Sequence, residues 1–214
     1  MDAFLSAPLK ENKGPVSPLS LAYAFRHLPV LETDRLILRK VRRSDADDLF
    51  AYARDPEVSR HVLWTAHQSK ADSRYFLSQL RRQYRMGWPP TFGIEEKATG
   101  RLVGTIGFMQ VSGEHACAEI GYSLSRACWN RGLMTEALEA VLRYAFTTLA
   151  LNRVEAMHET DNPASGRVME KNGMRPEGVF RSRIYNKTHY SDVRVWAILR
   201  EDWLLREENK HVQL

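Results

Sequence analysis

The amino-acid sequence predicts a single domain with an α+β fold. Three strand-like segments between residues 92 and 124 follow one another through short turns that contain glycine, which is typical of antiparallel strands. From Leu133 to Ala145, apolar residues then recur every three or four positions, the period of a long helix with one buried face. With 214 residues, of which 43% are hydrophobic, the chain can fill one substantial core.

Hydrophobic periodicity and turn signals predict the other elements. In chain order, the sequence predicts a strand at 31–41, a helix from Ser44 that ends at Asp55-Pro56, a helix from Ser69 to Arg85, strands at 92–96, 101–111 and 117–124, the long helix from Leu133, a strand at 153–158, a helix at 163–172, a hairpin of strands at 178–185 and 192–199, and a terminal helix around Trp203. Ser44 with Asp47, and Ser69 with Asp72, match a short form of the capping box at helix starts.

The first 30 residues differ in composition from the rest of the chain. They contain Pro8, Gly14, Pro15, Pro18 and Pro29, a composition that does not build a domain. The sequence therefore predicts an N-terminal extension over 1–30 that is partly mobile or packed on the body, one domain over 31–207 and a short tail over 208–214.

The chain is basic, with a net charge of +5 and a pI near 9.3. This charge suits an acidic ligand such as a phosphorylated cofactor, a nucleic acid or an acidic protein surface. The arginines stand in short groups such as Arg42-Arg43 and Arg81-Arg82, so the solvated faces of an ordinary basic protein explain them as well. No basic strand with interleaved aromatic residues and no recognition helix is evident, which weighs against nucleic acid as the partner.

Cysteine and histidine spacing matches none of the common metal-binding patterns. Cys117 and Cys128 form no C-x-x-C pair, and the seven histidines form neither H-x-x-x-H nor H-E-x-x-H. We therefore expect no metal and no disulfide. No apolar run approaches about 20 residues and the first residues lack a signal-peptide pattern, so we expect no membrane association and a cytoplasmic protein.

The loop W-N-R-G-L-M-T at 129–135, at the start of the long helix, has features of an anion-binding site. A helix start presents unpaired backbone N–H groups and the positive end of the helix dipole, so a phosphate or pyrophosphate is the expected ligand. Gly132 allows the backbone to approach such a ligand closely; the alternative is that it only eases a tight turn. The loop is neither a Walker A loop nor a G-x-G-x-x-G fingerprint.

Seven short motifs occur in order along the chain. They are L-E-T-D-R-L-I-L-R at 31–39, A-E-I-G-Y at 118–122, W-N-R-G-L-M-T-E-A at 129–137, D-N-P-A-S at 161–165, M-E-K-N-G-M at 169–174, E-G-V-F-R at 177–181 and L-R-E-D-W at 199–203. With these motifs the sequence resembles the GNAT acetyltransferase superfamily and, within it, the RimJ/RimL-like group, over residues 31–205.

The resemblance implies a mixed, mostly antiparallel sheet flanked by helices and splayed open between the strand that ends at Leu124 and the strand that ends near Glu159. Acetyl-CoA would lie in the splay as the acetyl donor, with no metal. Its pantetheine would pair with the backbone of residues 122–124, and its pyrophosphate with the N–H groups of residues 131–135.

The resemblance also implies a set of cofactor-binding residues by position in the motifs. They are Tyr122, Ser123, Leu124, Asn130, Arg131, Gly132, Leu133, Met134, Thr135, Asn162 and Ser165. Two residues depart from the superfamily's loop pattern, since Trp129 stands where Gln or Arg is usual and Met134 where Gly or Ala is usual. We expect the bulk of Met134 to narrow the phosphate site.

Acetyl transfer requires a neutral amine, a stabilised oxyanion and a proton or hydrogen bond for the leaving thiolate. Glu119 is the first candidate for the base, directly or through a water, although a structural pairing with an arginine is an alternative and both can hold. A backbone N–H at a strand bulge near Leu124 would serve the oxyanion. For the thiolate, Ser165 matches the family position and Tyr185 is second, while Ser165 has the alternative role of capping the helix after Asn162.

The predicted function is an acetyl-CoA-dependent N-acetyltransferase that transfers directly in a ternary complex to a protein or peptide N-terminal amine. One alternative acceptor is a small amine such as a polyamine, an aminoglycoside or an amino sugar, although the basic charge disfavours a cationic molecule. Another alternative is a noncatalytic acetyl-CoA-binding module, because the strand after E-G lacks the glutamate base that some relatives place there. Relatives often dimerise, which leaves a homodimer open.

Overall fold

The computed structural model describes residues 14–212, with side chains described to residue 210. The helices are α1 (Pro18–Arg26), α2 (Ala46–Ala53), α3 (Pro56–Ser59), α4 (Lys70–Met86), α5 (Leu133–Thr147), α6 (Pro163–Lys171) and α7 (Arg200–Val212), with short 3-10 turns η1 (Arg43–Asp45) and η2 (Arg126–Cys128). The strands are β1 (Leu31–Glu32), β2 (Leu36–Arg39), β3 (Thr91–Glu96), β4 (Arg101–Ser112), β5 (Cys117–Leu124), β6 (Arg153–Glu159), β7 (Arg175–Asn186) and β8 (His189–Leu199).

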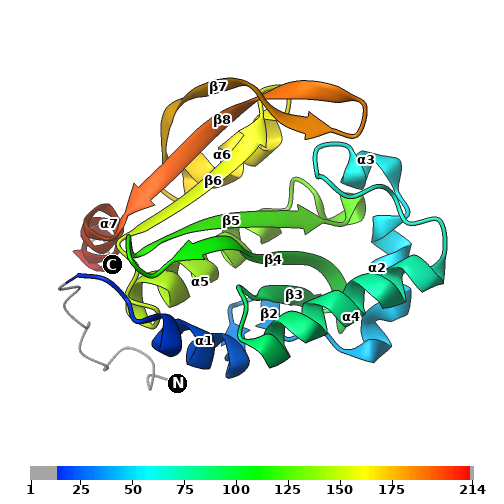
Figure 1. The fold of residues 1–214 in the computed structure, drawn as a ribbon, viewed down its shortest axis with the longest axis horizontal. Helices are drawn as coiled ribbons and strands as arrows, with labels where there is room; N and C mark the ends of the chain where they lie inside the picture. The colour runs from blue at the N-terminus through cyan, green and yellow to red at the C-terminus, as the bar shows by residue number, and fades with distance from the viewer. Residues whose placement is uncertain (1–13, 213–214) are drawn as a thin grey trace.

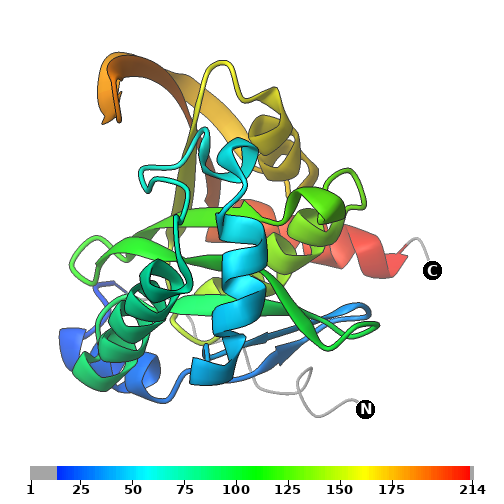
Figure 2. The same cartoon turned by 90° about the vertical axis from the view of Figure 1, so that its right-hand side faces the viewer.

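The strands form one mixed sheet in the order β1-β2-β3-β4-β5-β6-β8-β7. All neighbours are antiparallel except β5 and β6, which run parallel. Helices α5 and α6 cover one face of the sheet, and α2 and α4 lie on the other, as the two views in Figures 1 and 2 show. This architecture confirms the predicted α+β fold with a mostly antiparallel sheet.

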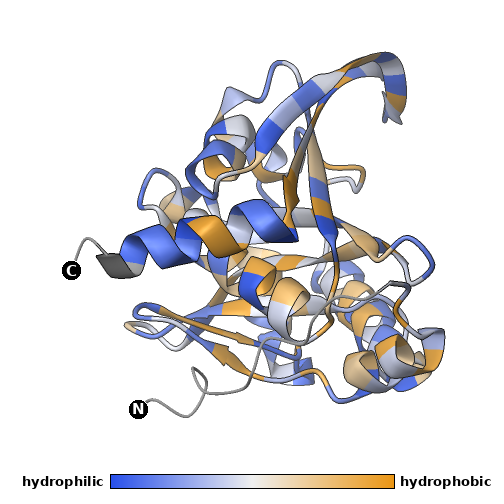
Figure 3. Ribbon diagram, turned by 90° about the vertical axis from the view of Figure 1, so that its left-hand side faces the viewer, coloured by the Kyte–Doolittle hydropathy of each residue, from blue (hydrophilic) through white to orange (hydrophobic). Residues whose placement is uncertain are grey.

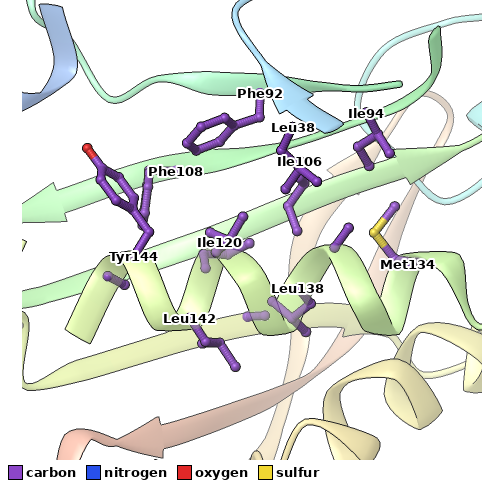
Figure 4. Close-up of a cluster of buried hydrophobic side chains, with 14 of the residues drawn as sticks. Leu38, Phe92, Ile94, Ile106, Phe108, Ile120, Met134, Leu138, Leu142 and Tyr144 are labelled. Carbon is purple, nitrogen blue, oxygen red and sulfur yellow. The ribbon is translucent and has the colours of Figure 1, made fainter. Parts of the chain in front are cut away.

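The main core lies between the sheet and α5. Its fully buried side chains come from the central strands and from the buried face of the helix. Figure 4 shows this cluster, with Phe92, Ile106 and Ile120 on the strands and Leu138 and Leu142 on α5. Burying side chains of this size contributes about 1.5–3 kcal/mol each. Figure 3 shows the contrast with the outer β7–β8 ribbon, which carries many hydrophilic residues. The core thus fixes β5 and α5, the two elements that frame the loop at 129–135.

The segment that precedes β1 packs on the body. Phe25 of α1 stacks on Phe108 of β4 with ring centroids 6.2 Å apart, and the Val16 N–H donates to the Gly113 carbonyl at 2.7 Å. Helix α1 also lies against α4 (Figure 1). Residues 1–13 of the expected extension, and residues 213–214 of the expected tail, lie outside the described residues.

The predicted strand at 31–41 is wrong as one element. The chain turns back at 33–35, so that β1 and β2 pair with each other in an antiparallel hairpin. The Thr33 N–H donates to the Leu36 carbonyl at 3.0 Å and closes this turn. Hydrophobic residues alternate on both sides of Thr33-Asp34, so the pattern resembles one continuous strand. A polar pair such as Thr-Asp can nevertheless form a turn without glycine or proline.

The capping box predicted for the next helix is also wrong, whereas the one predicted for α4 is confirmed. The residue that organises the first start is Asp45: its carboxylate accepts from the Arg42 N–H at 2.6 Å and from the buried Arg39 guanidinium at 2.9 Å. At the start of α4, the Ser69 N–H donates to the Asp72 carboxylate at 2.8 Å as predicted. The two helix starts differ because Arg39 binds the carboxylate at the first one. A local sequence pattern does not reveal a cation that lies five or more residues away in the chain.

Two further differences affect the site. Asp55-Pro56 ends α2 as predicted but also starts the short helix α3, where the Asp55 carboxylate accepts from the Glu57 N–H at 3.0 Å. The final hairpin is longer than predicted, since β7 and β8 run over 175–186 and 189–199. The extra length makes β7–β8 a ribbon that arches over the sheet toward α3 (Figures 1 and 2).

Candidate active site

The sheet opens between β5 and β6, as the family resemblance implied. The two strands pair only over Cys117–Glu119 and Arg153–Glu155, and they diverge beyond that point (Figure 1). On its other side β5 stays paired with β4 up to Leu124. Backbone groups of β5 that face the opening between Ile120 and Leu124 therefore have no neighbouring strand, and an extended amide-bearing chain could pair with them.

The loop at 129–135 has the backbone geometry of an anion site. Asn130 and Gly132 adopt positive φ values of 58° and 73°, in the left-handed region. Within the described chain, the N–H groups from Arg131 to Thr135 donate to no protein acceptor. Because they stand at the positive end of a helix of fifteen residues, they suit a phosphate.

Several side chains of this loop serve the protein rather than a ligand. The Arg131 guanidinium donates to the buried Glu96 carboxylate at 2.6 Å. Met134 is buried in the core beneath the sheet (Figure 4), so the expectation that it narrows the phosphate site is wrong. The Trp129 indole donates to the Leu124 carbonyl at 2.8 Å. This carbonyl, at the end of β5, therefore already has a hydrogen-bond partner.

Arg35 and Glu136 hold the loop in place, and no pattern in the sequence points to this pair. The Arg35 guanidinium donates to the Arg131 carbonyl at 2.9 Å and to Glu136 at 2.6 Å. Glu136 also accepts from the Thr33 hydroxyl at 2.6 Å. Burial acts to raise the pKa of Glu136, but these hydrogen bonds outweigh it and the pKa is lowered. The β1–β2 turn thereby holds the carbonyl of Arg131 through the Arg35 guanidinium.

A hydrogen bond between two hydroxyl groups spans the opening. Tyr122 of β5 reaches Ser165 of α6, with 2.8 Å between the hydroxyl oxygens and 3.2 Å to the Ser165 carbonyl. Asn162 caps α6 by accepting from the Ser165 N–H at 3.3 Å, so the Ser165 hydroxyl is not the cap. Burial raises the pKa of Tyr122, which keeps the phenol protonated and able to donate. The sequence placed Tyr122 here through its backbone alone and missed its side chain.

Glu119 stands where β5 and β6 part. Its carboxylate is half-buried and makes no hydrogen bond or ion pair with the part of the chain that the structure describes. Glu155 lies beside it in the parallel register, but Glu155 is paired with Arg153 at 3.0 Å. Burial and the charge of Glu155 raise the pKa of Glu119, and the guanidinium of Arg183 opposes this rise. A carboxylate in this setting can accept a proton near neutral pH more readily than an ordinary one.

The expected bulge near Leu124 lies elsewhere. Pairing between β4 and β5 is regular at Leu124, and the extra residue is Met109 of β4, between the pairs Phe108–Ile120 and Gln110–Glu119. An oxyanion donor from a distorted backbone at Leu124 is therefore not present in the described chain. The bulge instead lies beside Glu119, at the point where the sheet opens.

Tyr185, the second candidate for the thiolate, lies apart from Ser165 on the β7–β8 ribbon. Its exposed ring packs edge-on against Tyr190 at 5.1 Å, and within the described residues no hydrogen bond joins it to Glu119 or Ser165. The tip of the ribbon is tied to the loop after α3, because Lys187 donates to the Ser59 and Val62 carbonyls at 2.7 Å.

A buried carboxylate also links the tip of the β7–β8 ribbon to the loop after α3. Glu159, at the end of β6, accepts from the amide of Asn186 at 2.7 Å and contacts His61 Nδ1 at 2.7 Å. His61, Glu159 and Asp161 form the one group among the described residues whose donor atoms lie close enough to hold a metal ion. Both Glu159 oxygens already have hydrogen-bond partners and Asp161 is exposed, so the group is satisfied as a structural link.

The two cysteines are free thiols that do not pair. Cys128 is buried near Arg131, whose guanidinium lies 3.8 Å from the sulfur. Burial raises the pKa of Cys128, which disfavours a reactive thiolate.

Comparison with known proteins decides the family. The model of the acetyltransferase (GNAT) domain matches residues 35–175. The chain belongs to the GNAT acetyltransferase family. It is 36% identical over 172 residues to an uncharacterized N-acetyltransferase, YoaA, of Bacillus subtilis, which covers 80% of this chain and 97% of that protein. It is thus an N-acetyltransferase by family.

This GNAT chain is similar to ribosomal-protein N-acetyltransferases. It is 28% identical over 182 residues to the [ribosomal protein uS5]-alanine N-acetyltransferase of Escherichia coli, covering 81% of this chain and 92% of that protein. Its fold matches RimL, a ribosomal L7/L12 α-N-protein acetyltransferase solved in complex with coenzyme A, with a TM-score of 0.71, 21% identity and coverage of 80% and 98%. The GNAT fold predicted from the motifs is confirmed. No helix of the described GNAT chain combines the length and apolar character needed to cross a membrane.

Proposed function

We propose that this protein transfers an acetyl group from acetyl-CoA to the N-terminal α-amine of a protein or peptide, by direct attack in a ternary complex in the cytoplasm. The observation that carries the proposal is Glu119, a half-buried carboxylate without an ion-pair partner among the described residues, at the point where β5 and β6 separate. The basic surface of the chain and the uS5-alanine acceptor named for a relative support a protein acceptor over a small cationic amine.

The residues of the opening fit the donor. The unpaired edge of β5 suits the amides of a pantetheine arm, and the free N–H groups of residues 131–135 suit a pyrophosphate. Gly132 is the N-cap of α5 and adopts a positive φ, which glycine takes without strain. RimL, with the same fold, has been solved with coenzyme A, which supports this assignment.

The chain's own groups have two tasks in the reaction. Acetyl-CoA supplies an activated thioester carbonyl. Glu119 takes a proton from the attacking amine, directly or through a water, as the C–N bond forms and the C–S bond breaks. The Ser165 hydroxyl, held by Tyr122, donates a hydrogen bond to the departing thiolate. The thiolate then takes a proton from water to leave as the thiol, and Glu119 releases the amine proton to water. An α-amine has a pKa near 8, so a carboxylate base is adequate.

The double variant Glu119→Gln with Ser165→Ala tests the proposal. Coenzyme A binding, measured by calorimetry, should remain close to the wild-type value because neither side chain holds the pyrophosphate. Turnover of a free N-terminal peptide should fall at least about a hundredfold. Unchanged turnover in a folded variant would contradict the assigned roles.

A further inference from the structure

The β7–β8 ribbon carries a distortion that its hairpin turn does not require. Phe180 pairs with Val193 and Ile184 with Ser191, so that Arg181, Ser182 and Arg183 stand opposite the single residue Asp192. The turn of the hairpin lies farther on, at residues 187–188. Bulges of this kind redirect side chains and occur next to active sites more often than elsewhere in sheets.

The bulge is held by a specific contact and a strained residue. Ser182 adopts φ of 49°, in the left-handed region that non-glycine residues rarely enter. Its N–H donates to the Asp192 carboxylate at 2.8 Å. Arg181 and Arg183 therefore flank Ser182, which Asp192 holds in place, and both arginines are exposed. Such strain persists where the surrounding structure maintains it, often at binding sites.

Neither arginine is used by the fold. Within residues 14–212, the guanidinium groups of Arg181 and Arg183 make no hydrogen bond or ion pair. With Val179 and Phe180 they line an open hollow on the ribbon. Phe180 is 55% exposed, so the hollow combines apolar surface with two positive charges. Arg183 is also close enough to Glu119 to act on its carboxylate.

From the opening of the sheet to the bulge, the charge of the side chains therefore changes from negative to positive. Glu119 and Glu155, where the sheet opens, favour a positive group, and the two arginines of the bulge favour negative groups farther out. A peptide that enters with its α-amine toward Glu119 would pass the arginines with its next residues. An extended peptide advances about 3.4 Å per residue, so side chains at the second to fourth positions lie within roughly 10 Å of the amine.

We propose that the Arg181–Arg183 bulge selects acceptor peptides that carry Asp or Glu at the second to fourth positions after the free N-terminus. The inference rests on the proposed function and names its substrate class. Arginine binds carboxylates through paired hydrogen bonds, which makes it suited to this selection. The exposed apolar residues beside the arginines provide contact area for the remaining side chains of the peptide.

Three synthetic hexapeptides with a free N-terminal alanine test the proposal, identical except for Glu-Asp, Gln-Asn or Lys-Lys at positions three and four. Coenzyme A thiol release gives kcat and KM for each peptide. The acidic peptide should have a KM at least about tenfold lower than its amide counterpart, as expected for charge-assisted hydrogen bonds. This ratio should shrink as salt is raised, because the arginines are exposed.

Two variants separate this selection from a general effect. Arg181→Gln with Arg183→Gln should remove the preference, so that the acidic and amide peptides have the same KM in the variant. Arg181→Glu with Arg183→Glu should instead favour the Lys-Lys peptide. Arg85→Gln, at an exposed arginine in the last turn of α4, is the matched control and should keep the wild-type ratio.

The outcomes are distinct. Equal kcat/KM for the acidic and amide peptides would overturn the inference and leave the proposed function standing. Transfer to no free N-terminal peptide would overturn both. A double Arg→Gln variant that keeps the acidic preference but changes the oligomeric state in sedimentation would assign the bulge to an interface between copies of the chain and overturn the peptide role.

Discussion

The hydroxyl of Tyr122 lies 2.8 Å from the hydroxyl of Ser165 and joins β5 to α6 across the opening between the diverging strands. The alternation of β5 explains the contact, since Tyr122 shares its face of the strand with the buried Ala118 and Ile120 and therefore points toward α5 and α6. Ser165 is free to make the contact because Asn162 already caps α6. Tyr122 is thus a positioning residue for the hydroxyl proposed to serve the thiolate.

Tyr122→Phe should lower kcat by about tenfold or more with little change in the KM for acetyl-CoA, because the variant removes one hydrogen bond and keeps the ring. Steady-state kinetics on a free N-terminal peptide provide the measurement. Since Tyr122 acts through Ser165, the double variant with Ser165→Ala should be no slower than Ser165→Ala alone. Additive losses would show that the phenol acts independently.

The pH dependence of kcat should report Glu119. Burial and the charge of Glu155 raise the pKa of Glu119 above the ordinary value of 4.5. A base must be ionised to act, so kcat should rise with pH through this raised pKa. Glu119→Gln should remove that limb and lower kcat by about 10²–10⁴-fold. Glu155→Gln provides a second test. Because this variant removes the neighbouring negative charge, the rise of kcat with pH should occur at lower pH.

Glu136→Gln should destabilise the fold by about 1–3 kcal/mol, because the carboxylate accepts from Thr33 and from Arg35. The pKa of folded Glu136 is lowered, so the stabilisation by its carboxylate is present above the ordinary pKa of 4.5 and is lost as pH falls through the lowered value. Urea unfolding at pH 7 and at successively lower pH should show the difference between wild type and variant shrinking. A constant difference would indicate a cause other than the charge.

Gly107→Ala should destabilise the β3–β4 pairing. An added Cβ would lie 2.5 Å from the Thr91 Cα and 2.7 Å from the Pro90 carbonyl oxygen, both backbone atoms that cannot move aside. Overpacking of this kind costs about 1–3 kcal/mol. Gly121→Ala is the matched control, since its Cβ would meet only the flexible side chain of Met109 at 3.0 Å. Thermal unfolding should separate the two variants, and equal losses would contradict the argument.

The sequence predicted those parts of the molecule that depend on local chemistry. The period of α5, the capping of α4 by Ser69 and Asp72, and the helix start at Asn162 are set by residues within a few positions of each other. The family and the opening between β5 and β6 followed from motifs in order along the chain. These features recur because the same short patterns give the same backbone.

The parts that the sequence missed depend on contacts between distant residues. Arg35 reaches the loop before α5 from 96 positions away, and His61 meets Glu159 across 98 positions. The start of α2 was predicted wrongly because Arg39 orients Asp45 instead of Ser44 acting as the cap. The roles of Glu119, Ser165 and Tyr185 in catalysis stay predictions.

The most direct test of the account is coenzyme A release from acetyl-CoA across a panel of acceptors. The panel holds peptides with a free N-terminus, the same peptides N-blocked but carrying lysine, a polyamine and an aminoglycoside. We expect turnover of the free N-terminal peptides, none of the blocked ones, and at most weak turnover of the small amines. Turnover confined to a small amine, or acetyl-CoA binding without turnover of any acceptor, would contradict it.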